Sequence, residues 1–274
     1  MKKYRNLLDN MKIKLSLLVL VATTISLVTF YFHETEVMPQ SSIYFLEDAK
    51  LPSSGQNVLV FTPHPDDETI GVGGYIIESV KRGANVKIVL VTDGNKHGLK
   101  AKRYDEFKKA TGILGVSEKN LVYLNYGDGS LKNENQEKLY NDFNREIKAF
   151  NPNFVLYTDP GDTHPDHAAT GKVVEEVLQK EQFEDLQAYR YIIHHPHFPQ
   201  PKEFKKNLYL LPPVKLVRFD EEWQRFMLSD EEENQKFEAI STYKTQIRVP
   251  LLRSLMLSFV RKNELLSISS QLVK

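Results

Sequence analysis

Histidine and carboxylate side chains gather in two short segments of this sequence. Residues 62–68 read Thr-Pro-His-Pro-Asp-Asp-Glu, and residues 162–167 read Asp-Thr-His-Pro-Asp-His. Side chains able to bind a metal or transfer a proton are His64, Asp66, Asp67, Glu68, His164, Asp166 and His167. Each of these residues taken alone could have a structural role, because acids after a strand often cap the next helix. The occurrence of two such clusters instead indicates one functional site.

The combined residue types suit hydrolysis assisted by a metal. Two histidines and one carboxylate around a metal leave a position open for water, which is common in catalytic zinc sites. The two segments hold such a set, with a further carboxylate to accept a proton and a further histidine to stabilise an oxyanion. This pattern predicts cleavage of an amide or ester. Spacing alone does not decide between Asp66 and Asp67 as the metal ligand.

The elements around the segments predict how the two come together. Apolar runs and amphipathic stretches alternate along the chain. Strands are expected at 57–61, 86–92, 121–124, 153–157 and 189–193, and helices at 69–82, 100–114, 135–150 and 167–180. This alternation predicts an α/β fold with a doubly wound, mostly parallel sheet. In the strand order 3-2-1-4-5 the first and fourth strands are neighbours, so both segments would meet at one crevice.

The segments before and after this alternating pattern have different patterns of their own. We expect residues 56–274 to form one domain, whose C-terminal extension from about 205 contains a short strand pair and then helices at 230–246 and 250–262. Residues 33–55 lack clear periodicity and end in Pro-Ser-Ser-Gly, which predicts a linker.

The N-terminus has the pattern of a membrane anchor. Residues 1–14 form a short basic segment with five lysines or arginines against one acid, and residues 15–32 contain no charge. About 20 apolar helical residues cross a bilayer. Basic flanks stay cytoplasmic. We therefore expect a single-pass protein, in a bacterial cell membrane, with its catalytic domain on the extracytoplasmic side.

Composition excludes several kinds of chemistry. The 274 residues contain no cysteine, which removes disulfides, thiolate nucleophiles and cysteine-based zinc sites. Lysine plus arginine and aspartate plus glutamate each number 36. Beyond residue 33 acidic residues outnumber basic ones, 35 to 31. This balance argues against a nucleic-acid partner, which requires a clustered positive surface.

The motifs resemble those of the PIG-L/LmbE-like family of zinc-dependent N-acetylglucosaminyl deacetylases. The matching stretches are PHPDDETIGVGG at 63–74, VLVTDG at 89–94 and THPDH at 163–167, and the likeness covers about residues 56–266. The resemblance implies a Rossmann-like fold, a bound Zn²⁺ or another divalent metal, and removal of an N-acetyl group from an amino sugar.

Carried over position by position, the resemblance also implies roles. The implied zinc ligands are His64, Asp67 and His167. Asp66 would be the general base, and His164 the polarising group, with Asp166 orienting it or tuning its pKa. Glu68 would anchor the turn. Asp93 is expected to support the site because it closes the second strand. Sugar-binding positions are predicted at Arg103, Asp128 and, from its place after the fifth strand, His195.

Three other functions compete with this one. Residues 71–74 (Gly-Val-Gly-Gly) with Asp93 imitate a dinucleotide fingerprint, but Ile76 replaces its third glycine and the acids of 66–68 would repel a pyrophosphate. We therefore expect no nicotinamide cofactor. A non-catalytic, membrane-tethered sugar-binding protein is a second alternative. An amidase for another N-acyl compound, such as a small thiol conjugate, is a third. An outward-facing enzyme would more naturally meet an envelope glycan or a lipid-linked sugar.

Overall fold

The computed structural model describes residues 2–34, 38–181, 183, 185–217 and 221–269. By its contacts the chain divides into two units, Met1–Val37 and Met38–Lys274. Helix α1 (Lys2–Glu34) makes up the described part of the first unit. Within it, Met11–Phe30 has a mean hydropathy of 2.1 with none of its apolar window buried, so it is long and apolar enough to cross a membrane. A signal sequence has the same properties, and the predicted span at 15–32 therefore stays a candidate.

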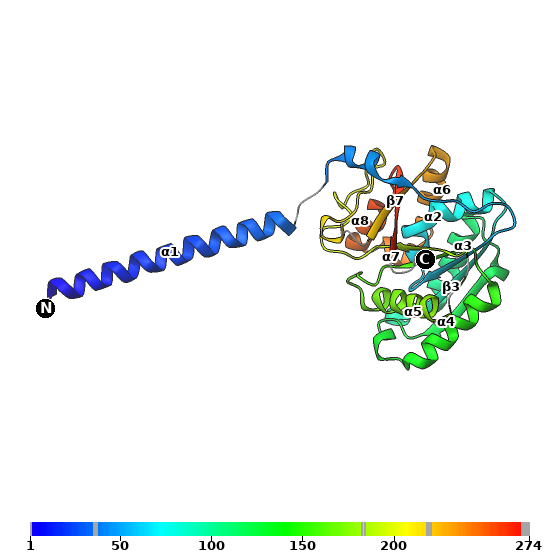
Figure 1. Cartoon of the computed structure of the whole chain (residues 1–274), viewed down its shortest axis with the longest axis horizontal. Helices are drawn as coiled ribbons and strands as arrows, with labels where there is room; N and C mark the ends of the chain where they lie inside the picture. The colour runs from blue at the N-terminus through cyan, green and yellow to red at the C-terminus, as the bar shows by residue number, and fades with distance from the viewer. Residues whose placement is uncertain (1, 35–37, 182, 184, 218–220, 270–274) are drawn as a thin grey trace. The chain divides into compact units, whose positions relative to one another are not determined.

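One eight-stranded sheet forms the centre of the second unit (Figure 1). Its strands are β1 (Glu47–Asp48), β2 (Asn57–Thr62), β3 (Asn85–Thr92), β4 (Leu121–Tyr126), β5 (Phe154–Thr158), β6 (Gln187–Tyr191), β7 (Glu221–Met227) and β8 (Asn263–Ser269). They are ordered β1-β7-β8-β6-β5-β2-β3-β4. Strands β2 to β6 are parallel and have the predicted order 3-2-1-4-5, which confirms that part of the prediction. Strand β8 runs antiparallel to both of its neighbours.

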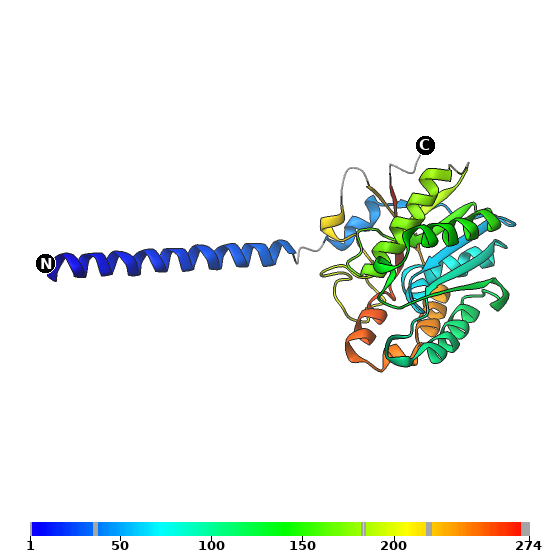
Figure 2. The ribbon, with the colours of Figure 1, turned by 90° about the horizontal axis from the view of Figure 1, so that it is seen from below.

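Helices cover both faces of the sheet. They are α2 (Asp67–Lys81), α3 (Lys100–Ile113), α4 (Gln136–Phe150), α5 (Pro165–Glu181), α6 (Asp230–Ile240), α7 (Lys244–Ile247) and α8 (Pro250–Ser258). Short 3₁₀ helices are η1 (Gln40–Phe45), η2 (Lys96–Gly98), η3 (Glu118–Asn120), η4 (Leu131–Asn133) and η5 (Val214–Leu216). Alternate residues of β2 face opposite ways, so Val58 and Val60 join the core with α2, α3 and α6, whereas Leu59 and Phe61 join the core with α4 and α5. Figure 2 shows α4 and α5 lying together on one face.

Part of the predicted linker at 33–55 is folded onto the sheet. Helix α1 extends to Glu34, residues 35–37 lie outside the described part of the chain, and η1 and β1 follow. Strand β1 pairs in parallel with β7, and Ile43 of η1 is fully buried. The prediction of a linker over 38–55 was wrong because a two-residue strand is too short to produce a hydrophobic period.

The C-terminal extension also differs from its prediction. Its two strands are not consecutive, because α6, α7 and α8 separate β7 from β8. The expected helix at 230–246 is interrupted between Ile240 and Lys244, and the helix expected at 250–262 ends at Ser258. Strand β8 carries no alternating pattern, since its residues 263–268 are all buried. A strand covered on both faces cannot be recognised by a period of two.

Glu264 of β8 ties this extension to the first chemical segment. Helix α2 is interrupted at Val72, whose φ of −138° and ψ of 21° are not helical. The Glu264 carboxylate accepts hydrogen bonds from the backbone N–H groups of Gly74 and Tyr75 at 2.7 and 2.8 Å. Lys236 of α6 lies 2.6 Å from the same carboxylate, and both side chains are fully buried. Strand β8 thus fixes α2, which begins inside the 62–68 segment.

Gly71 and Gly112 provide a matched test of this packing. A Cβ on Gly71 would lie 2.4 Å from Cδ2 of Tyr191 in β6, whereas a Cβ on Gly112 would meet nothing within 4 Å. Gly71→Ala should destabilise the fold by about 1–3 kcal/mol, because the buried ring must move. Gly112→Ala should be neutral or stabilising by about 0.5–1 kcal/mol, since alanine favours helix. Denaturant unfolding of the full chain, followed by circular dichroism, measures both; equal effects would contradict the close approach of α2 to β6.

Candidate active site

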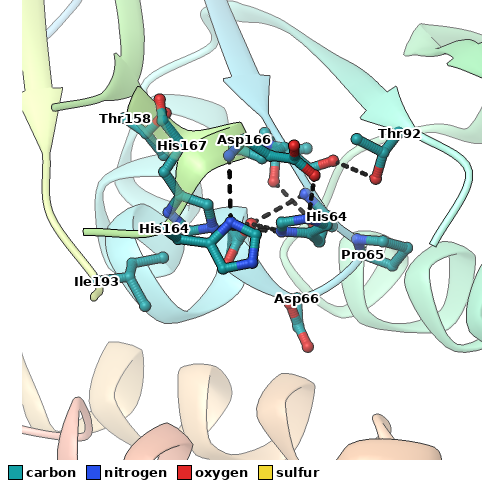
Figure 3. A network of polar contacts seen from close by, with 12 residues as sticks. His64, Pro65, Asp66, Thr92, Thr158, His164, Asp166, His167 and Ile193 are labelled. Atoms are coloured by element: carbon teal, nitrogen blue, oxygen red, sulfur yellow. Dashed lines mark hydrogen bonds and ion pairs between the residues drawn. The ribbon is translucent and has the colours of Figure 1, made fainter. Parts of the chain in front are cut away.

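Three side-chain atoms from the two segments converge at one point (Figure 3). His64 Nδ1 lies 3.1 Å from Asp67 Oδ2 and 3.2 Å from His167 Nε2, and the last two atoms are 3.0 Å apart. All three residues are buried. Two imidazole nitrogens and a carboxylate oxygen form the donor set of many zinc sites, so these residues fit a divalent metal. Further histidine and carboxylate groups around this point could also supply ligands.

The electrostatics of the three residues also favour a cation. Burial by itself lowers the pKa of both rings, but neighbouring carboxylates outweigh it. Contacts with Asp166 and Asp67 raise the pKa of His64 to about 9. Asp67 and Asp162 raise the pKa of His167 to about 10. Carboxylates that favour a proton here would equally favour a metal, which competes with protons for the same lone pairs.

Asp166 contacts His64 rather than the ring of His164. Its Oδ2 lies 3.1 Å from His64 Nε2, and its two oxygens accept hydrogen bonds from the backbone N–H groups of Gly129 and Leu131. The role predicted for Asp166 was to orient His164 or tune its pKa. Its backbone N–H donates to His164 Nδ1 at 3.3 Å, and its negative charge acts to raise the pKa of that ring, although burial and His64 lower it overall. A carboxylate on the second nitrogen of a metal-binding histidine fixes its ring orientation and tautomer.

Asp162 has the corresponding place beside the other histidine. Its Oδ2 lies 3.2 Å from His167 Nδ1 and accepts hydrogen bonds from the backbone N–H groups of Ile193 and His194. Sequence reasoning placed Asp162 in the cluster but assigned it no role. Its position five residues before His167, in the loop that leads into α5, was the available signal.

Asp66 lies next to this cluster in a strained conformation. Its φ is +129°, which residues other than glycine rarely adopt and which is typical of functional sites. It precedes α2, but its side chain makes no capping hydrogen bond, so the capping role does not account for it. Burial raises its pKa to about 8, opposed by Arg103, whose Nη2 lies 3.5 Å away. In Figure 3 its carboxylate points away from the histidine rings.

Glu68 is fully buried behind this turn. Its carboxylate accepts hydrogen bonds from Thr69 Oγ1 at 2.6 Å and from the Tyr243 hydroxyl, and weaker ones from Thr62 Oγ1 at 3.4 Å and the Asp66 backbone N–H at 3.3 Å. Burial raises its pKa. These contacts are those of a residue that anchors the turn, as predicted, and Tyr243 connects it to the C-terminal extension.

His164 and His194 lie beside the cluster. His164 Nδ1 accepts a hydrogen bond from the backbone N–H of Asp166 at 3.3 Å, so a neutral ring carries its proton on Nε2. Burial and His64 lower its pKa, which favours this neutral form. Burial also lowers the pKa of His194 to about 4. His194 lines the pocket described below, whereas His195, the predicted sugar-binding position, does not and contacts Pro196 O at 3.1 Å.

Arg103 and Asp128, the other predicted sugar-binding residues, lie together. Arg103 Nη1 is 3.1 Å from Asp128 Oδ2, and its Nη2 donates to Pro65 O at 3.1 Å. Asp128 Oδ1 lies 3.5 Å from His64 Nε2, and Asp93 Oδ1 accepts the Asp128 backbone N–H at 3.4 Å. Arg103 is buried, not on a solvated helix face. Its contacts hold Asp66 and Asp128 in place, and sugar binding stays a prediction.

A pocket of about 200 Å³ opens beside these residues. Its polar side is lined by His64, Asp66, Asp67, Lys96, Arg103, Asp128, His164, His194 and Gln246. The other lining side chains are apolar, namely Ile70, Ile193, Leu252, Leu255 and Met256, of which the last three belong to α8. Convergent polar groups together with apolar side chains are typical of ligand sites.

Comparison with protein families agrees with this geometry. The family model described as PIG-L, GlcNAc-PI de-N-acetylase, matches residues 59–178. Residues 59–178 of this chain are therefore similar to the PIG-L family. The match includes both chemical segments and ends before β6, so His194 and the whole C-terminal extension lie outside it.

Two curated relatives of this chain are named as deacetylases. A probable N-acetyl-alpha-D-glucosaminyl L-malate deacetylase 2 of Bacillus anthracis is 35% identical over 136 residues, 45% of this chain and 59% of the relative. A diacetylchitobiose deacetylase of Thermococcus kodakarensis is 34% identical over 128 residues, 42% of this chain and 46% of the relative. The chain thus spans about half the length of these relatives.

Solved structures show the same fold as this chain. The N,N'-diacetylchitobiose deacetylase from Pyrococcus horikoshii superposes with a TM-score of 0.59 at 22% identity, over 88% of this chain and 92% of that one. A deacetylase of the teicoplanin biosynthesis pathway gives 0.60 at 17% identity, over 78% and 99%. At these identities the likeness extends to the fold alone.

The glycines that imitate a dinucleotide fingerprint have a packing role in this domain. Residues 71–74 lie inside α2, which begins at Asp67, and not at the helix N-terminus where a pyrophosphate binds. A Cβ on Gly74 would lie 2.8 Å from Leu228. Their absent side chains therefore let α2 approach β6 and the C-terminal extension.

Asp162 gives a test of the metal site. Asp162→Asn should lower the affinity of the full chain for zinc by about 10–100-fold, because an amide neither attracts the His167 ring as strongly nor fixes its tautomer. Asp105→Asn, at an exposed position of α3, is the control and should leave affinity unchanged. Competition with a chromogenic chelator measures both. Equal affinities for wild type and Asp162→Asn would contradict the assignment of His167 as a ligand.

Proposed function

We propose that this protein is a metal-dependent deacetylase that removes the N-acetyl group from an N-acetylglucosamine-type sugar. The observation that carries the proposal is the convergence of His64 Nδ1, Asp67 Oδ2 and His167 Nε2 within 3.2 Å, with the free carboxylate of Asp66 beside them in the pocket. The PIG-L match and the deacetylase names of both relatives support the reaction type.

Two histidines and one aspartate are proposed to hold the metal: His64, Asp67 and His167. Zinc at this place would supply Lewis acidity, which lowers the pKa of a water and polarises the amide carbonyl. Asp162 and Asp166, on the outer nitrogens of the two histidines, keep both rings oriented toward the site.

Asp66 is proposed to move the proton. Its carboxylate accepts a proton from the attacking water, whose oxygen bonds to the acetyl carbon. It then passes this proton to the amide nitrogen as the carbon–nitrogen bond breaks, leaving acetate and a free amine. The nearby guanidinium of Arg103 and the strained backbone hold the carboxylate in the pocket.

His164 is proposed to stabilise the oxyanion. Because its Nδ1 accepts a backbone hydrogen bond, its Nε2–H is available to donate to the carbonyl oxygen as negative charge develops there. Asp128 and Arg103, which line the pocket, are proposed to contact sugar hydroxyls. His194 also lines the pocket and is proposed for the sugar-binding role that the sequence suggested for His195.

Asp66→Asn separates catalysis from metal binding. The amide cannot accept the proton, so acetate release should fall by about 10²–10⁴-fold while zinc content stays at the wild-type level. Asp105→Asn is the control with full activity. The substrates are diacetylchitobiose, N-acetylglucosaminyl malate and extracted envelope glycan, each assayed with the full chain in detergent. Unchanged release by Asp66→Asn would contradict its role as the base.

Metal removal tests the proposed reaction as a whole. A chelator should abolish acetate release, and zinc added back should restore it. Release that survives the chelator would exclude metal-dependent hydrolysis. A chain that binds metal but releases acetate from none of the three substrates would instead contradict the substrate class.

We also propose that α1 anchors the protein with the deacetylase domain outside the cell, where it would meet envelope glycans or lipid-linked sugars. The apolar span Met11–Phe30 and the basic residues before it support this orientation.

The absence of cysteine allows a direct test of orientation. A cysteine introduced at the exposed position Lys119 should react with a membrane-impermeant maleimide in intact cells, because that position would lie outside. A cysteine at Lys3 should react only after the cells are opened. Labelling of Lys3→Cys in intact cells, or none at Lys119→Cys, would contradict the orientation.

A further inference from the structure

The segment α7–α8 (Lys244–Ser258) has two different sides. Leu252 and Leu255 contribute to the apolar wall of the pocket. Val249 and Leu251, in the same stretch, expose 45% and 78% of their surface. Apolar side chains gain free energy by leaving water, so contact of these two residues with an apolar partner would be favourable.

The charge of this segment is entirely positive. No aspartate or glutamate occurs from residue 239 to residue 263. Lys244, Arg248 and Arg253 are exposed, and within the described chain their side chains have no hydrogen bond or ion pair. Elsewhere many exposed lysines and arginines pair with carboxylates, as Lys138 does with Asp142 at 2.9 Å. The unpaired cations of this segment are therefore free to meet an anionic surface.

Exposed apolar residues beside unpaired cations match the chemistry of an anionic lipid surface. Apolar side chains enter the boundary between headgroups and acyl chains, and lysine and arginine contact the phosphates. The same chain carries the candidate span Met11–Phe30.

We propose that Lys244, Arg248, Val249, Leu251 and Arg253, the α7–α8 rim, dock on the anionic surface of the bilayer. Docking would place the pocket, which the next residues of α8 line, at the level of the lipid headgroups. The rim would thus restrict the enzyme to acceptor sugars held at or near the membrane. This surface lies outside the residues 59–178 that match the PIG-L family.

Spin labelling tests the docking without requiring activity, so its outcome is independent of the proposed reaction. The full chain with Leu251→Cys, its only cysteine, is labelled with a nitroxide and reconstituted into nanodiscs. One set contains phosphatidylcholine alone, and the other an equimolar mixture with phosphatidylglycerol. Collisions with oxygen, which concentrates in lipid, are compared with collisions with an aqueous nickel complex. Lys119→Cys, exposed on η3, is the control label.

We expect the label at residue 251 to shift toward oxygen and away from nickel in the anionic nanodiscs, while the control label stays aqueous in both. Adding Arg248→Glu and Arg253→Glu, or raising the salt concentration, should reverse the shift. Near-ultraviolet circular dichroism of Trp223, the sole tryptophan and a buried one, checks that the double variant is folded. Raising the salt concentration tests the same charge contact without any substitution beyond the labelled cysteine.

Three results would overturn the proposal. A label at residue 251 that stays aqueous in both kinds of nanodisc would exclude docking. An equal shift in both would exclude the role of the cations. Dipolar broadening between labels on two chains would assign the rim to contact between copies of the protein.

Discussion

The parallel pairing of β2 with β5 is the constraint on which the site depends. Val58 lies opposite Phe154 and Val60 opposite Leu156, so both strands end at the same edge of the sheet. The connection from β2 into the start of α2 brings His64, Asp66 and Asp67, and the connection from β5 into the first turn of α5 brings His164 and His167. Residues about 100 positions apart therefore place three donor atoms within 3.2 Å.

This convergence puts many charges into a buried space, and each needs compensation. An isolated buried charge is costly, so the polar residues of the site are connected in pairs and networks. The carboxylates of Asp166 and Asp162 each accept hydrogen bonds from two backbone N–H groups and each contact a histidine ring. The Glu68 carboxylate accepts hydrogen bonds from the hydroxyls of Thr69 and Tyr243. The same contacts that satisfy these groups also fix their positions before any substrate arrives.

The C-terminal extension completes the site from outside the family match. Strand β8 enters the sheet between β6 and β7, and Glu264 with Lys236 fastens α2. Tyr243 reaches Glu68 behind the turn, and α8 supplies the apolar wall of the pocket. The proposed metal ligands therefore lie inside the residues 59–178 that match the PIG-L model, whereas three apolar residues of the pocket lining come from α8, outside that match.

The local pattern of the sequence by itself determined much of the fold of this protein. Apolar runs separated by helices specify a parallel sheet, and the handedness of strand–helix–strand connections restricts its order, so both chemical segments could be assigned to one crevice. Sequence also indicated the candidate ligands, because few other places combine histidines with adjacent acids, although only the family resemblance favoured Asp67 over Asp66. Only the tertiary structure decided that Asp166 faces His64, that Asp162 supports His167, that His194 rather than His195 lines the pocket, and that Arg103 is buried beside Asp66. The direction of a side chain in a loop depends on backbone angles and on neighbours far away in sequence, such as the φ of +129° at Asp66, and no periodicity records them.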